Sequence, residues 1–374
     1  MQNSRLRLVD LNYHCHDAIT QPGDVLAIHA PSDRYAYLLS EKMEVHFVKH
    51  ANLDVLHRDG HVTYRFFKSR NRFWHIPFAT HRYVKKLQPG IVLVQGLVFP
   101  LQLIFLAILL GRKTTIIVQH HGERPCRGLK LLLQRLAGKF IQACFFTSNG
   151  NAAAWIDKKI ISNAGKCHEV LEASTFFIQE DKTTCRALLE MGDEMVFLWV
   201  GRLHTLKDPI TVLQSFAGFL NNGGQATLYM IYQSDELLPE IKALLNSNPL
   251  LQNAVKLVGK LLHSELAAWY SAADFFLSGS HKEGSGYALI EAMACGCIPV
   301  VTDIPSFRKI TGKGSACFLF PPGDSATLLH LLNQLEHIDR KAFSIQVLQQ
   351  FRNQLSFETI AADIYRVCRQ LNPE

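Results

Sequence analysis

The sequence predicts an α/β protein of two domains, each built on a parallel β-sheet. Short apolar segments rich in β-branched residues alternate with helix-length segments through both halves of the chain. This alternation is typical of parallel strands joined by crossover helices that cover both faces of a sheet. The length of 374 residues suits two domains, and a hydrophobic share of 48% with 19% charged residues indicates a globular chain.

Five strands are expected in the first half of the chain. They are the β-rich runs Val25–Ile28, Val45–Val48, Ile91–Val94, Thr115–Val118 and Ala143–Phe146. The apolar segment 91–110 is long enough to span a bilayer, but it contains Gln95, Pro100 and Gln102. We therefore expect a strand, a turn and a buried helix there. No G-x-G-x-x-G pattern follows the first strands, so a dinucleotide site is not expected in this half.

The second half of the chain starts a new series of strands after a polar segment. Six strands are expected, at Val196–Val200, Ala226–Ile231, Val255–Val258, Phe275–Leu277, Ile298–Val301 and Cys317–Phe320. The predicted boundaries are a first domain at 1–178, a linker at 179–194, a second domain at 195–350 and a final segment at 351–374. That final segment contains a helix with an apolar stripe formed by Ile360, Ile364 and Val367.

Charge is unevenly distributed along the chain. Residues 1–180 contain 23 Lys and Arg against 13 Asp and Glu, whereas the remainder contains 16 against 19. A basic first half suits an anionic membrane surface or an acidic acceptor, and no recognisable motif favours nucleic acid. Nine cysteines without a C-x-x-C spacing, and an N-terminus without the apolar core of a signal peptide, favour a reducing cytoplasm.

The segment from Glu283 to Glu291 lies between two expected strands and has the sequence EGSGYALIE. A glycine-flanked turn that opens a helix leaves backbone N–H groups unpaired, and the helix dipole behind them favours a phosphate. The two carboxylates repel phosphate and instead accept hydrogen bonds from hydroxyl groups. This layout fits a nucleotide diphosphate sugar. The alternative is an ordinary helix start with two solvated glutamates.

Two cations flank the turn that follows the strand at 196–200. Arg202 and Lys207 come after the strand, and Asp208 and Pro209 are placed as N-cap and first residue of the next helix. Arginine binds phosphate oxygens in pairs and lysine adds a point charge, so the two suit a diphosphate. The alternative is a basic surface without a ligand.

Two further stretches in the first half carry candidate functional residues. His120 and His121 follow the strand at 115–118, at the strand end where open α/β sheets bind ligands; the alternative is a solvated loop. The segment 127–140 places Lys130, Arg135 and Lys139 among leucines. It is either an amphipathic helix facing the core or one that lies on a membrane.

Several of these motifs occur together in one known family. The motifs are Val200-Gly-Arg-Leu203, Lys207, Val258-Gly259, the Glu283-Gly-x-Gly286 turn, the Glu291-Ala-Met-Ala-x-Gly296 helix, Pro299-Val-Val301 and Pro322-Gly-Asp324. In order and spacing they resemble the retaining glycosyltransferases of family 4, within glycosyl transferases group 1. The second half resembles that family throughout and the first half only weakly. The resemblance implies a GT-B fold, with two Rossmann-like domains facing an interdomain cleft and the C-terminal helix crossing back to the first domain.

The resemblance also implies a role for individual residues. Arg202 and Lys207 would hold the donor diphosphate, Glu283 the sugar hydroxyls and Glu291 the ribose hydroxyls. Backbone amides would contact the sugar and phosphate from Gly284, Ser285, Gly286 and Tyr287, and the base would lie near Gly259 and Lys260. His121 would approach the sugar from the first domain, which makes Glu283, His121, Arg202 and Lys207 the expected catalytic residues.

Three features depart from the family pattern. Ser285 stands where relatives often have Phe, and Arg308 lies where they often have Glu. The usual glycine-rich loop after the first strand is missing, and Gln21-Pro-Gly23 is its nearest counterpart.

We expect retaining transfer of a hexose or hexosamine from a nucleotide diphosphate sugar to a hydroxyl of a glycan or lipid-linked acceptor. No Asp-x-Asp motif occurs, so we expect neither a metal nor another cofactor. The expected location is cytoplasmic, with peripheral contact to an anionic membrane through the basic first domain. The alternatives are a nucleotide-sugar epimerase on the same fold and a nucleotide-sugar-binding subunit of a polysaccharide assembly complex.

Overall fold

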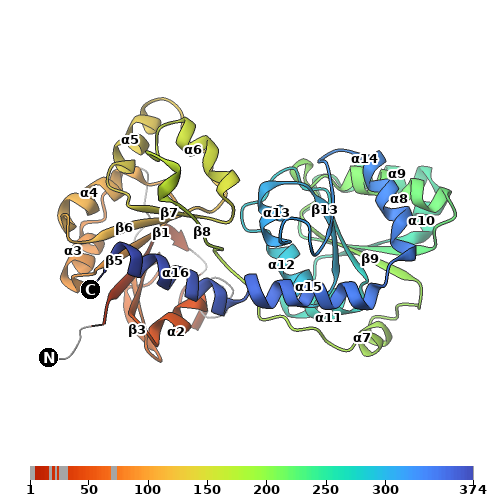
Figure 1. Ribbon diagram of the computed structural model, residues 1–374, viewed down its shortest axis with the longest axis horizontal. Coiled ribbons are helices and arrows are strands. Elements are labelled where there is room, and N and C mark those ends of the chain that lie inside the picture. The colour runs from red at the N-terminus through yellow and green to blue at the C-terminus, as the bar shows by residue number, and fades with distance from the viewer. Residues whose placement is uncertain (1–4, 17–18, 22, 25–32, 69–73, 374) are drawn as a thin grey trace. The chain divides into compact units, whose positions relative to one another are not determined.

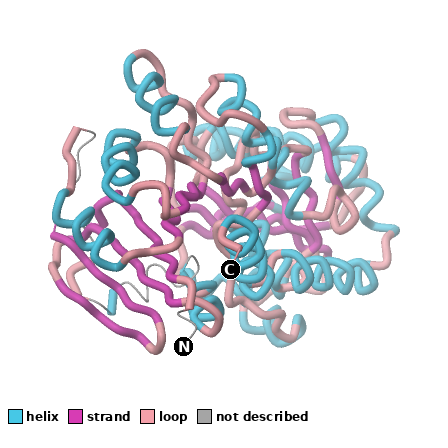
Figure 2. Tube along the Cα trace, turned by 60° about the vertical axis from the view of Figure 1, so that its left-hand side comes forward, coloured by secondary structure: helices cyan, strands magenta, loops and turns pink. Residues whose placement is uncertain are grey.

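The computed structural model describes residues 5–16, 19–21, 23–24, 33–68 and 74–373. The chain divides into two compact units (Figure 1). The first contains Met1–Ser174 and Phe357–Glu374, and the second contains Thr175–Ser356. Each is an α/β unit with a largely parallel sheet, and in Figure 2 the strands of each unit lie between helices. The expected strand Val25–Ile28 lies outside the described residues.

The first unit is built on a sheet that has eight strands in the part of the chain described. The strand order is β3-β4-β2-β1-β5-β6-β7-β8, and every pair is parallel except β3 with β4. The strands are β1 Arg7–His16, β2 Glu44–Ala51, β3 Val55–Asp59, β4 Val62–Lys68, β5 Ile91–Gln95, β6 Thr115–Gln119, β7 Ala143–Phe146 and β8 Cys167–Glu169. The antiparallel β3–β4 hairpin corrects the expectation of a purely parallel sheet.

Strand β1, which the sequence analysis did not predict, lies in the centre of this sheet between β2 and β5. Its apolar residues are interrupted by Asp10, which is nevertheless only 2% exposed. Tyr35 Oη donates a hydrogen bond to Asp10 Oδ2 at 2.5 Å, and Gln95 Nε2 donates to the same oxygen at 2.6 Å. Burial raises the pKa of Asp10 to about 6. Asp10 interrupts the apolar pattern by which a strand is predicted. Its burial depends on Tyr35 and Gln95, which are distant in sequence, so the strand could not be predicted locally.

The helices of the first unit include the C-terminal one. They are α2 Tyr35–Ser40, α3 Phe78–Leu87, α4 Pro100–Leu110, α5 Leu129–Gly138, α6 Ala153–Asp157 and α16 Phe357–Leu371. Helix α16 packs on α2, and its stripe of Ile360, Ile364 and Val367 is buried. The segment 91–110 forms β5 and α4, as predicted. Among the described residues, no helix combines the length and the apolar character needed to cross a membrane.

The second unit is described throughout and has a six-stranded parallel sheet in the order β11-β10-β9-β12-β13-β14. The strands are β9 Met195–Gly201, β10 Ala226–Tyr232, β11 Val255–Gly259, β12 Phe275–Ser278, β13 Ile298–Thr302 and β14 Phe318–Phe320. All six expected strands are therefore confirmed. The helices are α7 Lys182–Leu188, α8 Pro209–Asn221, α9 Leu238–Ser247, α10 Pro249–Ala254, α11 Leu266–Ala272, α12 Tyr287–Ala294, α13 Pro305–Ile310, α14 Ser325–Gln334 and α15 Arg340–Gln354.

The segment 179–194 is not a linker, because the structure places it inside the second unit. Helix α7 is attached to the sheet through Asp274, which is 6% exposed and lies just before β12. Lys182 Nζ and Arg186 Nη2 each lie 2.7 Å from its carboxylate, and the backbone N–H of Val196 donates to it at 2.9 Å. The polar residues that suggested a linker are the partners of a buried charge.

We predict that Asp274→Asn lowers the free energy of unfolding of the second unit by about 2–3 kcal/mol, because it leaves Lys182 and Arg186 without their carboxylate. Burial alone would raise the pKa of Asp274, but the two cations hold it below its usual range. The stabilisation is therefore full above the ordinary Asp pKa of about 4 and is lost as pH falls through the folded-state pKa. Urea unfolding at several pH values measures this effect.

The exposed Asp193 provides the control, since Asp193→Asn should change the unfolding free energy by less than about 0.5 kcal/mol. An Asp274→Asn protein as stable at neutral pH as the control would contradict the assigned role of this carboxylate.

Candidate functional site

The topology of the second sheet defines where a ligand site is expected. Beginning at β9, the chain moves to β10 and β11 on one side and to β12, β13 and β14 on the other. In open α/β sheets, ligands bind beyond the carboxyl ends of the strands at the point where the winding direction changes. That point lies between β9 and β12. The two segments that leave these strands contain Arg202 and Lys207 after β9, and Glu283 after β12.

Lys207 and Glu283 form an ion pair that joins these two segments. Lys207 ends the short 3₁₀ turn Thr205–Lys207, and its side chain is 26% exposed against 14% for Glu283. The buried Ser280 hydroxyl donates a second hydrogen bond to the same Glu283 oxygen at 2.7 Å. The carboxylate is thus held in one orientation while it remains partly accessible to solvent.

The start of helix α12 requires glycine at position 286. Gly286 is the N-cap and has a φ of +69°, and a Cβ there would lie 2.6 Å from Ile310 Cδ1. A glycine cap has no side chain to accept the N–H groups of the first helical turn. The N–H groups of the first turn of α12 are therefore left without a side-chain cap. Tyr287 follows as the first residue of α12 and is exposed, and Gly284 and Ser285 lie in the partly exposed loop before it.

Glu291 lies inside α12 and is only 6% exposed, so it is not a solvated glutamate. Tyr270 Oη donates to Glu291 Oε2 at 3.1 Å, and His263 Nε2 lies 2.7 Å from Oε1. This hydrogen bond raises the pKa of His263 above its ordinary value. The His263 ring also stacks on Phe177, with the ring centroids 4.8 Å apart. Tyr270 and His263 were not predicted as site residues.

The remaining predicted residues of the second unit lie at strand ends without direct contact to Glu283. The Arg202 and Lys260 side chains are exposed, and no hydrogen bond or ion pair of either is found within the described residues. Gly259 ends β11 with a φ of +88°. Arg308 on α13 forms an ion pair with Asp303, which lies just before this helix.

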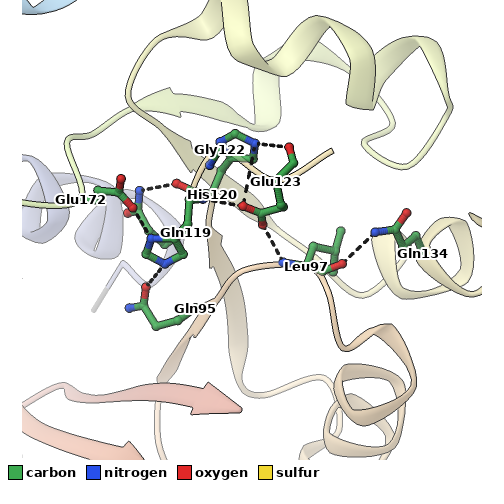
Figure 3. Close-up of polar contacts among 9 residues, drawn as sticks. Gln95, Leu97, Gln119, His120, Gly122, Glu123, Gln134 and Glu172 are labelled. Carbon is green, nitrogen blue, oxygen red and sulfur yellow. Dashed lines mark hydrogen bonds and ion pairs between the residues drawn. The ribbon is translucent and has the colours of Figure 1, made fainter. Parts of the chain in front are cut away.

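In the first unit, His121 lies at the carboxyl end of β6 in a chain of hydrogen bonds. Its Nε2 donates to Gln95 Oε1 at 2.8 Å, and its Nδ1 donates to the buried carboxylate of Glu172 (Figure 3). Gln95 in turn donates to Asp10, so its amide oxygen must face the histidine. Because both ring nitrogens donate, the imidazole is in its charged form. Burial would lower the pKa of His121, but the pairing with Glu172 raises it.

His120 has a different environment and a structural role. Its Nε2 donates to the Glu123 carbonyl at 3.0 Å, and its Nδ1 accepts from the N–H of Gly122 at 3.2 Å, so the ring is neutral. Burial lowers its pKa. Glu123 also accepts from the backbone N–H groups of His121 and Leu97, at 2.6 and 2.9 Å (Figure 3). Of the two histidines, only His121 presents an exposed ring.

Sequence reasoning missed the partners of each candidate residue. Glu172, Gln95 and Asp10 around His121, and His263 and Tyr270 around Glu291, come from elements separated in sequence by 21 to 111 residues. No local sequence pattern predicts these residues, because their role depends on a contact with a residue that is distant in sequence. Among the described residues, no group of three or more His, Cys, Asp or Glu is arranged to hold a metal ion.

Comparison with known sequences finds similarity in the second unit. Residues 181–347 match the model of the family of glycosyl transferases group 1. D-inositol 3-phosphate glycosyltransferase of Streptosporangium roseum is 25% identical over 156 residues, which are 39% of this chain and 35% of that protein. GDP-mannose:cellobiosyl-diphosphopolyprenol alpha-mannosyltransferase of Xanthomonas campestris is 40% identical over 67 residues, 17% of this chain and 18% of that protein. The chain spans about a third or less of the length of these relatives.

Comparison with solved structures covers the whole chain. Sucrose-phosphate synthase from Thermosynechococcus elongatus superimposes with a TM-score of 0.71 at 18% identity, covering 98% of this chain and 99% of that one. Anabaena HepE in complex with UDP gives a TM-score of 0.71 at 14% identity, covering 98% of this chain and 100% of that one. The chain therefore has the GT-B fold of two Rossmann-like units.

We predict that Glu172→Gln lowers the pKa of His121, because the carboxylate is what stabilises the charged ring. In the wild-type protein the ring should titrate above its ordinary pKa of about 6.5. The His121–Glu172 pair thus contributes stability that is full below that value and is lost as pH rises through the folded-state pKa. An NMR titration of the ring C–H resonances measures both proteins.

The neutral His120 serves as the internal reference, since its pKa should remain below the ordinary value in both proteins. If His121 titrates at the same pH with and without the Glu172 carboxylate, the charged state assigned to it is wrong.

Proposed function

We propose that this protein is a retaining glycosyltransferase that uses a nucleotide diphosphate sugar as donor. The observation that supports the proposal best is the Lys207–Glu283 ion pair at the switch point of the second sheet. It combines a cation for phosphate oxygens and a carboxylate for sugar hydroxyls at the edge where such sheets bind ligands. The match of residues 181–347 to glycosyl transferases group 1 supports the same assignment.

The proposed donor diphosphate is held by Lys207, Arg202 and the first turn of α12. The ammonium and guanidinium groups neutralise the charge that develops as the diphosphate leaves, and the N–H groups of the helix start add oriented dipoles. These groups carry the proposed stabilisation of the leaving group without a metal ion. Glu283 accepts hydrogen bonds from the sugar and orients its anomeric carbon.

The nucleoside is proposed to extend toward Glu291 and the end of β11. Glu291 Oε1 accepts a hydrogen bond from His263, and Glu291 Oε2 accepts one from Tyr270. A carboxylate has about four lone-pair positions, so both ribose hydroxyls can still be accepted. The base is assigned to the backbone at Gly259 and Lys260. His263, which contacts the Glu291 carboxylate, also stacks on Phe177, so aromatic rings line this side of the proposed site.

The proposed reaction breaks the bond between the anomeric carbon and the diphosphate oxygen, which departs with the electron pair. The hydroxyl of a glycan or lipid-linked acceptor forms the new bond on the same face, and its proton passes to the departing diphosphate oxygen. His121, charged and exposed at the edge of the first sheet, is assigned to substrate contact. All nine cysteines are free thiols, in keeping with the reducing cytoplasm proposed as the location.

We predict that Glu283→Ala reduces the rate of sugar transfer by about 100-fold or more, because the sugar loses the group that orients it. Fold and nucleotide affinity should be retained, since this side chain is at the surface of the site. Release of UDP or GDP from the nucleotide sugar measures the rate, with Glu240→Ala, an exposed carboxylate on α9, as control.

Transfer by Glu283→Ala at the rate of the control would rule out the role assigned to this residue. Change of sugar stereochemistry without any acceptor would identify an epimerase instead. Absence of both transfer and donor hydrolysis in the wild-type protein would favour a binding subunit.

We predict that Arg202→Ala and Lys207→Ala each weaken binding of a free nucleoside diphosphate about tenfold, with the larger loss for Lys207→Ala. The lysine variant both removes a cation and leaves Glu283 unneutralised beside the phosphate. A thermal-shift panel of UDP-, GDP- and ADP-sugars first selects the base, since a ligand at 100 times its Kd stabilises by about 2.7 kcal/mol.

Isothermal titration with the selected nucleotide then compares both variants with Lys256→Ala, which removes an exposed cation on β11. Affinities unchanged in both site variants would contradict the diphosphate assignment, and no thermal shift with any donor would contradict the proposed function as a whole.

A further inference from the structure

Helix α5 packs only some of its leucines against the core, namely Leu131 and Leu133. The residues buried on α5 are Gln134, Ala137 and Gly138. Leu129, Leu132 and Leu136 are 62%, 56% and 42% exposed. At about 3.6 residues per turn, the three leucines lie on the side of the helix opposite Gln134. The core-facing alternative therefore holds for Leu131 and Leu133, whereas Leu129, Leu132 and Leu136 form a second, exposed apolar side.

Polar contacts on the inner side of α5 fix this orientation. The fully buried Gln134 donates from Nε2 to the Leu97 carbonyl at 2.8 Å (Figure 3). Its amide oxygen accepts from the N–H of Cys126 at 2.8 Å. At the end of the helix, Gly138 lies against the backbone of Ile160, where any Cβ would collide with the carbonyl. Rotating the leucines inward would break two buried hydrogen bonds, so their exposure is built into the fold.

The neighbouring helix α4 enlarges the apolar surface. It lies beside α5 (Figure 1). It buries Leu103, Ile104 and Leu106, but Phe105 and Ile108 are 42% and 65% exposed. We call the five exposed side chains the α4–α5 face: Phe105, Ile108, Leu129, Leu132 and Leu136. Clustered exposed apolar residues on a folded protein mark an interaction surface.

The charges around the α4–α5 face identify the kind of partner. From Phe105 to Phe140 the sequence contains seven Lys and Arg and a single acidic residue, Glu123. Six of the cations are exposed: Arg112, Lys113, Arg124, Arg127, Lys130 and Lys139. The Glu123 carboxylate is mostly buried and accepts backbone N–H groups. Leucines and a phenylalanine surrounded by exposed cations fit the interface of an anionic lipid bilayer.

We propose that the α4–α5 face docks the protein on an anionic membrane surface. The apolar side chains enter the interface between headgroups and acyl chains, and the surrounding cations contact lipid phosphates. The binding is peripheral and is independent of the nucleotide-sugar chemistry assigned to the second unit. It brings the protein to the surface at which a lipid-linked acceptor would be found.

Co-sedimentation of the full chain with vesicles tests the proposal. Vesicles of equal parts phosphatidylcholine and phosphatidylglycerol should bind the protein, and phosphatidylcholine vesicles should bind it at least tenfold more weakly. Each cation near an anionic surface contributes about fivefold to partitioning, so binding should fall steeply with added salt. Leu129→Ser with Leu132→Ser should reduce binding to the anionic vesicles at least tenfold, because two side chains no longer enter the interface.

Matched variants separate this surface from general effects. Leu188→Ser replaces a leucine that is 73% exposed on α7, and it should leave vesicle binding unchanged. The double substitution Arg112→Gln and Lys113→Gln should weaken binding to anionic vesicles and make it less dependent on salt. Lys341→Gln on α15 should leave both properties unchanged. Nucleotide-induced thermal shifts should be the same in all these variants, so loss of vesicle binding is distinguishable from failure of the proposed donor site.

Three results would overturn the proposal. The first is no binding to anionic vesicles, and the second is binding that the Leu129 and Leu132 substitutions leave unchanged. The third is a wild-type dimer in solution that the same substitutions dissociate without altering vesicle binding, which would identify the α4–α5 face as a contact between two copies of the chain.

Discussion

Parallel pairing at the centre of each sheet is the constraint on which both candidate sites depend. Parallel strands cannot be joined by tight turns, so the chain must cross over each sheet through a helix. In the second unit it winds one way from β9 and the other way from β12. The segments that leave β9 and β12 therefore run in opposite directions, and no crossover helix lies between them. The ion pair between Lys207 and Glu283 connects these two segments.

Buried polar groups fix the parts of each unit that apolar packing leaves undetermined. Asp10 binds two donors in the middle of β1, and Asp274 attaches α7 to the sheet of the second unit. Gln134 determines which side of α5 faces inward. Burying any of these polar side chains without its hydrogen-bond partners would cost free energy and destabilise the fold. The partners therefore make one arrangement strongly preferred over alternatives with a similar apolar core.

The two units have different electrostatic character. The candidate site of the second unit pairs a cation with a carboxylate, and the two side chains hold each other in place. In the first unit the charge is concentrated in exposed lysines and arginines around an apolar surface, while His121 is held charged by a buried Glu172. A fixed ion pair suits recognition of a small ligand, and exposed cations suit an extended anionic surface.

The sequence by itself determined the β–α alternation, all six strands of the second sheet, the caps at Asp208 and Gly286, and the residues gathered at the switch point. These features are encoded locally, in the periodicity of apolar residues and in the turn chemistry between them. Only the tertiary structure decided that β1 is a central strand, that residues 179–194 belong to the second unit, and that Leu129, Leu132 and Leu136 of α5 face outward. The reason is physical: whether a polar residue can be buried depends on donors and acceptors that folding brings from distant segments.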